Sequence, residues 1–138
     1  MLHVLIAVGL SWAEEPSPSV VSTLDEAVVR TAPSGRVSVA ELLTGKNAFI
    51  GRLEMDPGAA VPLHRDPTEE YLVVLEGGGV LQLDGVSHSL RAGSVVFMPA
   101  GAEVSFQNGP AKLLALQVFA GPESASKYAS WAPVSDTP

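Results

Sequence analysis

The sequence predicts an all-β protein built on a single antiparallel β-barrel, and three observations lead to that class. Short apolar segments of alternating character recur between glycine, proline and aspartate residues from position 47 to 119. The 138 residues include 13 glycines and 11 prolines, which suits a turn-rich β protein better than a helical bundle. A chain of this length has room for about one domain.

Composition and charge exclude several classes of protein. With 46% hydrophobic and 17% charged residues the chain can bury a core, so it is not disordered throughout. A net charge of −7 disfavours binding to the phosphates of nucleic acids. The chain has no cysteine, which excludes disulfides, thiolate metal sites and cysteine nucleophiles. No apolar run reaches the ~18 residues of a membrane span.

Residues 1–13 resemble a secretory signal peptide. They carry no charged side chain, are mostly apolar and end in Ser11-Trp12-Ala13, which places small residues three and one positions before Glu14. We therefore expect cleavage ahead of Glu14 and a secreted or periplasmic protein. The alternatives are that this segment is a buried first strand or the remainder of a truncated longer leader; if the protein is not exported, we expect it to be cytoplasmic.

Residues 14–46 are expected to be a lead-in segment with short N-terminal helical segments. Thr23 to Glu26 and Ser38 to Glu41 each match a capping box, in which a hydroxyl and a glutamate satisfy the first amides of a helix. Gly45 would end the second helix. At the other end, residues 121–138 form an expected C-terminal extension, with Tyr128 and Trp131 packed onto the barrel.

The barrel itself is expected over residues 47–120. Eight short strands separated by turn signals predict a sandwich or barrel of jelly-roll type, and Asp84-Gly85 is a tight hairpin signal between two of them. The expected strands are Phe49–Met55, Val61–His64, Glu70–Leu75, Val80–Leu83, Val86–Leu90, Val95–Met98, Glu103–Gln107 and Leu113–Phe119.

Three polar residues around one strand connection form the candidate site. His64 ends one expected strand, Asp66 lies in the bend, and Glu70 begins the next strand on the same face as two apolar residues. If that face is the barrel interior, Glu70 is a buried carboxylate, which is costly unless it is paired or bound to a metal. His64, Asp66 and Glu70 are therefore candidate ligands for a divalent ion such as Mn, Fe, Zn or Ni.

The same segment resembles the first motif of the cupin family, G-x5-H-x-H-x3-E-x6-G. Gly58, His64, Glu70 and Gly77 occupy its fixed positions, and Asp66 stands where the family has a second histidine. Cupins are small jelly-roll barrels, so the resemblance implies the fold that the strand pattern predicts. The family's usual metal ligands are three histidines and one glutamate, of which His64 and Glu70 are present.

A second block resembles the second cupin motif, G-x5-P-x-G-x2-H-x3-N. Gly93, Pro99, Gly101 and Asn108 match it, and Val104 stands where the family has a histidine. The resemblance thus implies a cupin with a degenerate metal motif. Two interpretations stay open: a weak metal site, or a metal-free cluster of hydrogen-bonded polar groups at the barrel mouth.

Other polar residues are secondary candidates. His88 shares a strand face with Val86 and Leu90, so it would supply a nitrogen ligand if that face points inward, but a half-buried strand histidine is the simpler interpretation. Gln82 and Gln117 interrupt apolar strands and either orient a ligand or face solvent, and Arg52 is expected to face solvent.

Two functions compete on this evidence. The first is a small-molecule-binding or scaffold barrel, which Val104 favours because it removes a ligand and makes the pocket wall apolar. The alternative is a metal-dependent enzyme, by resemblance a dioxygenase or isomerase, using His64, Asp66 and Glu70. The expected partners are a small molecule and a second copy of the chain in a homodimer, and neither nucleic acid nor a catalytic serine triad is expected.

Overall fold

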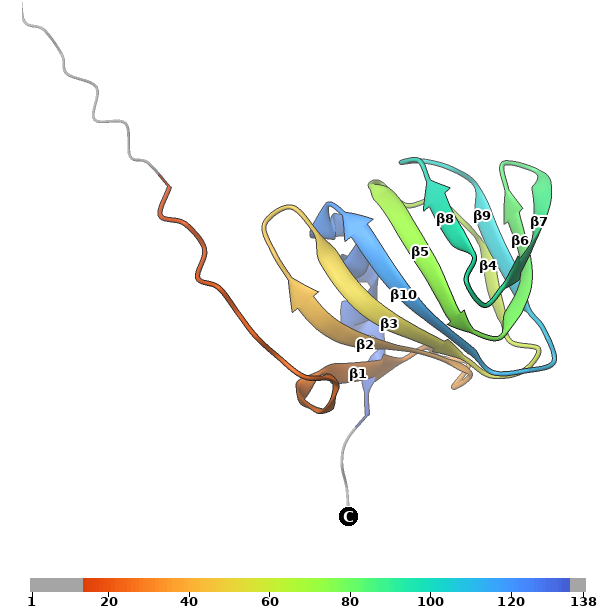
Figure 1. Ribbon diagram of the computed structural model, residues 1–138, viewed down its shortest axis with the longest axis horizontal. Helices are drawn as coiled ribbons and strands as arrows, with labels where there is room; N and C mark the ends of the chain where they lie inside the picture. Colours follow the sequence, from red (N-terminus) through yellow and green to blue (C-terminus); the bar gives the residue numbers. More distant parts are fainter. Residues whose placement is uncertain (1–13, 135–138) are drawn as a thin grey trace, which may run out of the picture.

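The computed structural model describes residues 14–134 of the chain (Figure 1). The expected leader, residues 1–13, falls outside these residues. In the described range no helix is long and apolar enough to cross a membrane.

Most of the described chain is β-structure, as the sequence predicts. The two 3-10 helices are η1 (Leu24–Glu26) and η2 (Pro122–Ser130). The strands are β1 (Val28–Thr31), β2 (Val37–Thr44), β3 (Phe49–Met55), β4 (Ala60–His64), β5 (Glu69–Glu76), β6 (Gly78–Leu83), β7 (Val86–Arg91), β8 (Val95–Met98), β9 (Val104–Asn108), β10 (Leu113–Ala120) and β11 (Ala132–Pro133).

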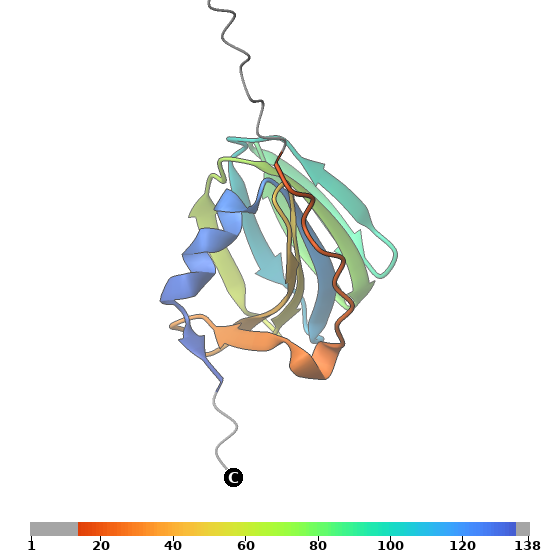
Figure 2. The same cartoon turned by 90° about the vertical axis from the view of Figure 1, so that its left-hand side faces the viewer.

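The strands form two antiparallel sheets that face each other (Figure 1). The larger sheet has the order β11-β1-β2-β3-β10-β5-β8, and the smaller has the order β4-β9-β6-β7. The all-β prediction is confirmed, although the two sheets do not join into a closed barrel. Figure 2 shows the side of the molecule that η2 crosses on its way from β10 to β11.

The alternation that the sequence predicts for β5 is the alternation that the structure has. Glu70, Leu72 and Val74 are buried on the inner face, while Tyr71 and Leu75 are exposed on the outer face. Strand β5 pairs with β10 on one side and with β8 on the other, which fixes its register and its inward face.

The lead-in segment differs from the prediction. The first capping box exists, because Glu26 accepts a hydrogen bond from the backbone N–H of Thr23, but it heads a single 3-10 turn, η1. The second predicted helix is wrong: Ser38 to Glu41 lie within β2, between β1 and β3. Burial of Val37 and Val39 on one face of the sheet outweighs the local helix signal.

Two apolar clusters hold the sheets and η2 together. The larger lies between the two sheets and includes Met55, Leu113 and Ala115, each at most 1% exposed. The smaller consists of Val39, Phe49, Phe119 and Tyr128, and it joins η2 to the large sheet. The second cluster therefore determines where the C-terminal extension lies.

Candidate functional site

A cavity of about 450 Å³ lies between the inner faces of the two sheets. Its volume falls within the range of small-molecule sites, roughly 300–1,000 Å³. Polar groups from the β4–β5 connection, β10 and η2 also line this cavity. The apolar wall includes Met55, Leu72, Val74, Leu81, Met98 and Phe106.

The structure brings the candidate residues of the first motif to this one cavity. His64, Asp66 and Glu70 all line it, and so does Val104. Val104 is the antiparallel partner of His64 on β9, so the two side chains lie on the same face of the smaller sheet. The side chains of His64 and Asp66 are 29% and 13% exposed, and Glu70 is 7% exposed.

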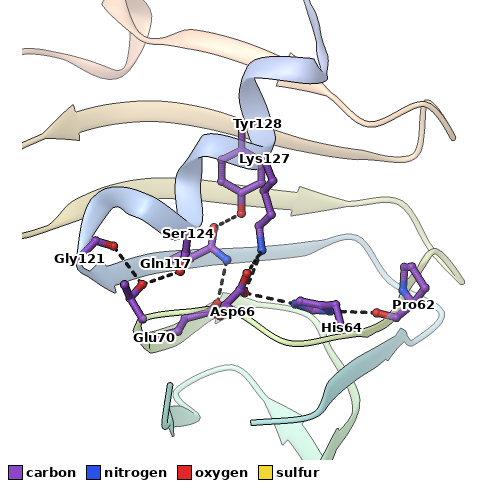
Figure 3. A network of polar contacts seen from close by, with 10 residues as sticks. Pro62, His64, Asp66, Glu70, Gln117, Gly121, Ser124, Lys127 and Tyr128 are labelled. Carbon is purple, nitrogen blue, oxygen red and sulfur yellow. Dashed lines mark hydrogen bonds and ion pairs between the residues drawn. The ribbon is translucent and has the colours of Figure 1, made fainter. Parts of the chain in front are cut away.

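A lysine of the C-terminal extension completes the cluster (Figure 3). The Lys127 ammonium donates to Oδ1 and Oδ2 of Asp66 at 2.8 and 2.9 Å. On its other side, Asp66 lies 3.4 Å from Nε2 of His64. Nδ1 of His64 donates to the Pro62 carbonyl oxygen at 2.9 Å, which fixes the orientation of the imidazole ring.

Glu70 belongs to a second, buried chain of hydrogen bonds (Figure 3). Nε2 of Gln117 donates to Oε1 of Glu70 at 2.8 Å, and the Tyr128 hydroxyl donates to Oε1 of Gln117 at 2.6 Å. Gln117 on β10 pairs with Leu72, so its side chain shares the inner face with Glu70. The amide thus links a carboxylate on β5 to a phenol on η2.

The surroundings of each ionisable group shift its pKa in a definite direction. The hydrogen bond with Asp66 raises the pKa of His64, although burial and the Lys127 charge oppose it. Burial raises the pKa of Asp66, but the hydrogen bonds from His64 and Lys127 outweigh it, so the net pKa is lowered. Burial raises the pKa of Glu70 despite the Gln117 hydrogen bond and the Lys127 charge. Burial also raises the pKa of Tyr128.

Replacing Glu70 with glutamine is expected to stabilise the protein at neutral pH. Burial disfavours the Glu70 carboxylate, so its folded pKa lies above its unfolded pKa and its contribution to stability is lost as pH rises through the folded value. A glutamine side chain does not ionise, so it avoids this loss of stability and still accepts the hydrogen bond from Gln117. We expect the melting temperature to rise by about 3–5 °C at pH 8, the shift that ~1 kcal/mol gives, with little change at pH 4.

Melting curves from pH 4 to pH 8 measure this effect, with Glu69→Gln as the matched control on the exposed face of the same strand. A difference between Glu70→Gln and the parent that stays constant with pH would contradict the interpretation.

The secondary candidates lie in different places. His88 is exposed on β7, and Gln82 donates to the Ser87 hydroxyl at 2.6 Å, so neither belongs to the cavity lining. Gln117 does line it, as one of its two interpretations expects. Arg52 is half-buried, and its Nε is buried without a hydrogen-bond partner among the described residues.

Sequence reasoning missed Lys127. Its signal is weak but present, because it is the only basic residue after Lys112 and directly precedes Tyr128, an aromatic residue expected to pack on the barrel. Tyr128 is 2% exposed, which confirms that packing. Ser124 of η2 was also missed, and it bonds Thr68 in the β4–β5 connection.

Comparison with known proteins identifies the family. A protein family described as "Cupin domain" matches residues 51–117, which span β3 to β10 without the lead-in strands. Residues 51–117 are a cupin domain. An RmlC-like cupin from Shewanella frigidimarina superposes with a TM-score of 0.68 at 19% identity, over 75% of this chain and 92% of that one. The cupin jelly roll predicted from the motifs is thereby confirmed.

Two further proteins that are similar to this cupin are named after different enzyme activities. It is 35% identical over 81 residues to the dimethylsulfoniopropionate lyase DddW of Ruegeria pomeroyi, a match that covers 55% of this chain. The chain spans about half of that relative's length, 53%. A predicted oxalate decarboxylase from Thermotoga maritima superposes with a TM-score of 0.67 at 27% identity, over 74% of this chain and 99% of that one.

The side chains at the candidate ligand positions of this cupin, in the arrangement that the structure has, do not fit the metal ion that the family pattern implies. Both oxygens of Asp66 are bonded to Lys127, and Val104 offers no lone pair at the position of the missing histidine. In the described range, no three His, Cys, Asp or Glu side chains are grouped closely enough to hold a metal. The predicted ligand set of His64, Asp66 and Glu70 stays a prediction.

Proposed function

We propose that this cupin binds a small molecule with an apolar body and a polar head group inside the jelly roll. The single observation that carries the proposal is the cavity of about 450 Å³, apolar along its wall and polar where His64, Asp66, Lys127 and Glu70 meet. Such a site holds the apolar part of a ligand by excluding water and orients it through a few polar contacts.

The charges at the polar end define the head group that would fit. Lys127 and His64 present N–H donors, and Asp66 and Glu70 present oxygen acceptors. A head group that both donates and accepts, such as a hydroxyl, carboxylic acid or sulfonate beside a donor, can use both kinds of partner. A purely apolar ligand would leave these partly buried groups without compensation for lost water.

The environment-sensitive dye 8-anilinonaphthalene-1-sulfonate tests the proposal, since it combines an apolar body, an N–H donor and an anionic head. We expect one dye per chain, with a fluorescence increase on binding. Leu90→Trp places an indole in the cavity wall and is expected to weaken binding at least 10-fold. Val86→Trp on the same strand, 56% exposed and outside the lining, is the matched control.

A pair of aromatic side chains on the exposed outer face is a second place where the dye could adsorb, so the control is necessary. Tyr71 and Phe97 lie on the exposed face with ring centroids 5.2 Å apart, and a dye adsorbed there would also fluoresce. Equal dye affinity in the parent and in Leu90→Trp would therefore place the dye outside the cavity and reject the proposal.

A second candidate function is a lyase, and the 35% identity to the dimethylsulfoniopropionate lyase favours it. Nδ1–H of His64 donates to Pro62, so Nε2, which lies 3.4 Å from Asp66 in this structure, is the nitrogen that would act as a general base in such a lyase. Incubation of the parent and His64→Ala with dimethylsulfoniopropionate, followed by proton NMR, measures this activity directly. Consumption by the parent alone supports it, and no consumption by either removes it.

A metal-dependent cupin enzyme, dioxygenase- or isomerase-like, is the alternative that the family pattern suggests. It would use His64, Asp66 and Glu70 as ligands. The Lys127–Asp66 ion pair argues against it. Elemental analysis of protein purified without a metal-affinity tag separates it from the metal-free proposal.

A further inference from the structure

We infer that the ammonium of Lys127 takes the place of a divalent metal ion in this cupin. It supplies from the chain itself the positive charge that the family motif assigns to a metal, and it excludes divalent ions from Asp66. Three observations carry the inference: the contacts of Lys127, the way it is held and the replaced ligand positions. It does not depend on which small molecule enters the cavity.

The contacts of Lys127 are those of a charge partner. Its Nζ lies 2.8 Å from Oδ1 and 2.9 Å from Oδ2 of Asp66, so both oxygens of that carboxylate face the ammonium. Asp66 is the better-buried member of the pair, with its side chain 13% exposed against 35% for Lys127. A carboxylate at that depth needs a counter-charge, and Lys127 provides it.

Lys127 is held in the site by aromatic rings of β10 and η2 and by the hydrogen bonds that anchor η2. Nζ lies 5.2 Å from the ring centroid of Phe119 and 5.6 Å from that of Tyr128, which places the ammonium against two aromatic rings. The Tyr128 hydroxyl bonds Gln117, and Thr68 bonds both Ser124 and the Gly121 carbonyl. These contacts hold the ammonium at the polar end of the cavity, where the Lys127 side chain is 35% exposed.

The charge of Lys127 acts on all three predicted metal ligands. Its positive charge favours the ionised forms of Asp66 and Glu70 and the neutral form of His64, although other causes leave the pKa of Glu70 and of His64 raised. A bound divalent ion would act in the same direction on the same groups. The lysine thus performs the electrostatic part of the role of a metal, without its coordination chemistry.

Two residues that differ from the cupin motifs agree with the replacement of a metal ion by Lys127. Asp66 stands where the family has a histidine, and a carboxylate attracts an ammonium where a neutral imidazole would not. Val104, opposite His64 on β9, removes a further nitrogen. A divalent ion coordinated by Asp66 would have to lie within a few ångströms of Nζ, and the repulsion would weaken binding by about 100-fold or more.

The test compares metal binding by the untagged parent, Lys127→Met and Lys112→Met. Lys112 is the matched control because it also forms an ion pair, with Glu54 at 3.0 Å, but outside the cavity. Zn²⁺ and Mn²⁺ are titrated by calorimetry, and melting temperature is measured with and without each metal. We expect no metal-induced shift in the parent or in Lys112→Met. Lys127→Met should melt lower without metal and regain stability with it, with affinity at least 10-fold above the parent.

Further variants assign the effect to the site. Asp66→Asn/Lys127→Met should lose the metal response. Adding Val104→His to Lys127→Met should strengthen it at least 10-fold, whereas Val104→His alone should change little because Lys127 still holds Asp66. Lys127→Gln, which keeps an N–H donor for Asp66 without the charge, is measured in parallel in case the methionine variant folds poorly.

Two results would overturn the inference. The first is a parent that binds either metal as tightly as Lys127→Met and Lys127→Gln do. The second is the absence of a metal response in these variants even when Val104→His is added. Neither result bears on dye binding in the cavity, so failure here is distinguishable from failure of the proposed function.

Discussion

Phe119→Ala is expected to lower the free energy of unfolding by about 3–5 kcal/mol. Phe119 is 0% exposed and lies between two other rings, with centroids 5.8 Å from Phe49 and 6.3 Å from Tyr128. Alanine leaves a cavity at the centre of the cluster that attaches η2 to the large sheet. Because η2 carries Lys127, the same change should also loosen the polar end of the site.

Urea unfolding measures the stability loss, and the dye titration measures the loss at the site. Phe97→Ala is the control, because Phe97 is 48% exposed on the outer face and its truncation should cost less than ~1 kcal/mol. Equal losses for the two phenylalanines would mean that the cluster around Phe119 does not support the fold as described.

Gly77→Ala is expected to cost several kcal/mol, well above Gly58→Ala, although both glycines occupy fixed positions of the first motif. Both have positive φ, +75° and +69°, so alanine meets backbone strain of about 1–2 kcal/mol at either position. A Cβ on Gly77 would in addition lie 2.4 Å from the Lys112 carbonyl oxygen, whereas the nearest atom to one on Gly58 is the end of the Arg36 side chain at 3.8 Å.

The backbone at Lys112 cannot move without disturbing the start of β10, and this is why the two costs should differ. Urea unfolding of both variants gives the comparison directly. If Gly77→Ala were no less stable than Gly58→Ala, the close approach of the two chain segments at Gly77 would not limit the fold.

Much of the strand pattern could be predicted because it depends on local residue order. Phe49–Met55 and Val95–Met98 are strands with the expected bounds, and Asp84-Gly85 forms the expected hairpin turn with φ of +49° and +80°. The alternation in β5 predicted that Glu70 faces inward, and it is buried there. These features follow from a period of two and from turn residues, which neighbours along the chain determine.

The local sequence gave a wrong prediction at Ser38 to Glu41, where the residues of a helix capping box lie within strand β2. The two signals compete: the capping box offers a few hydrogen bonds to a short helix, while β2 gains a ladder on both sides and buries Val37 and Val39. The sheet partners come from β1 and β3, so no window of sequence around Ser38 contains the deciding information.

The sequence by itself determined the all-β fold, the inward face of Glu70 and the approach of His64, Asp66 and Glu70 to one cavity. A strand and the following connection place those residues within seven positions of one another, so chain connectivity alone keeps them close. Only the tertiary structure decided what they contact. Lys127 reaches Asp66 across 61 positions, and Gln117 reaches Glu70 across 47. Those contacts depend on the packing of η2 by Phe119 and Tyr128, a long-range result of burial that periodicity does not encode.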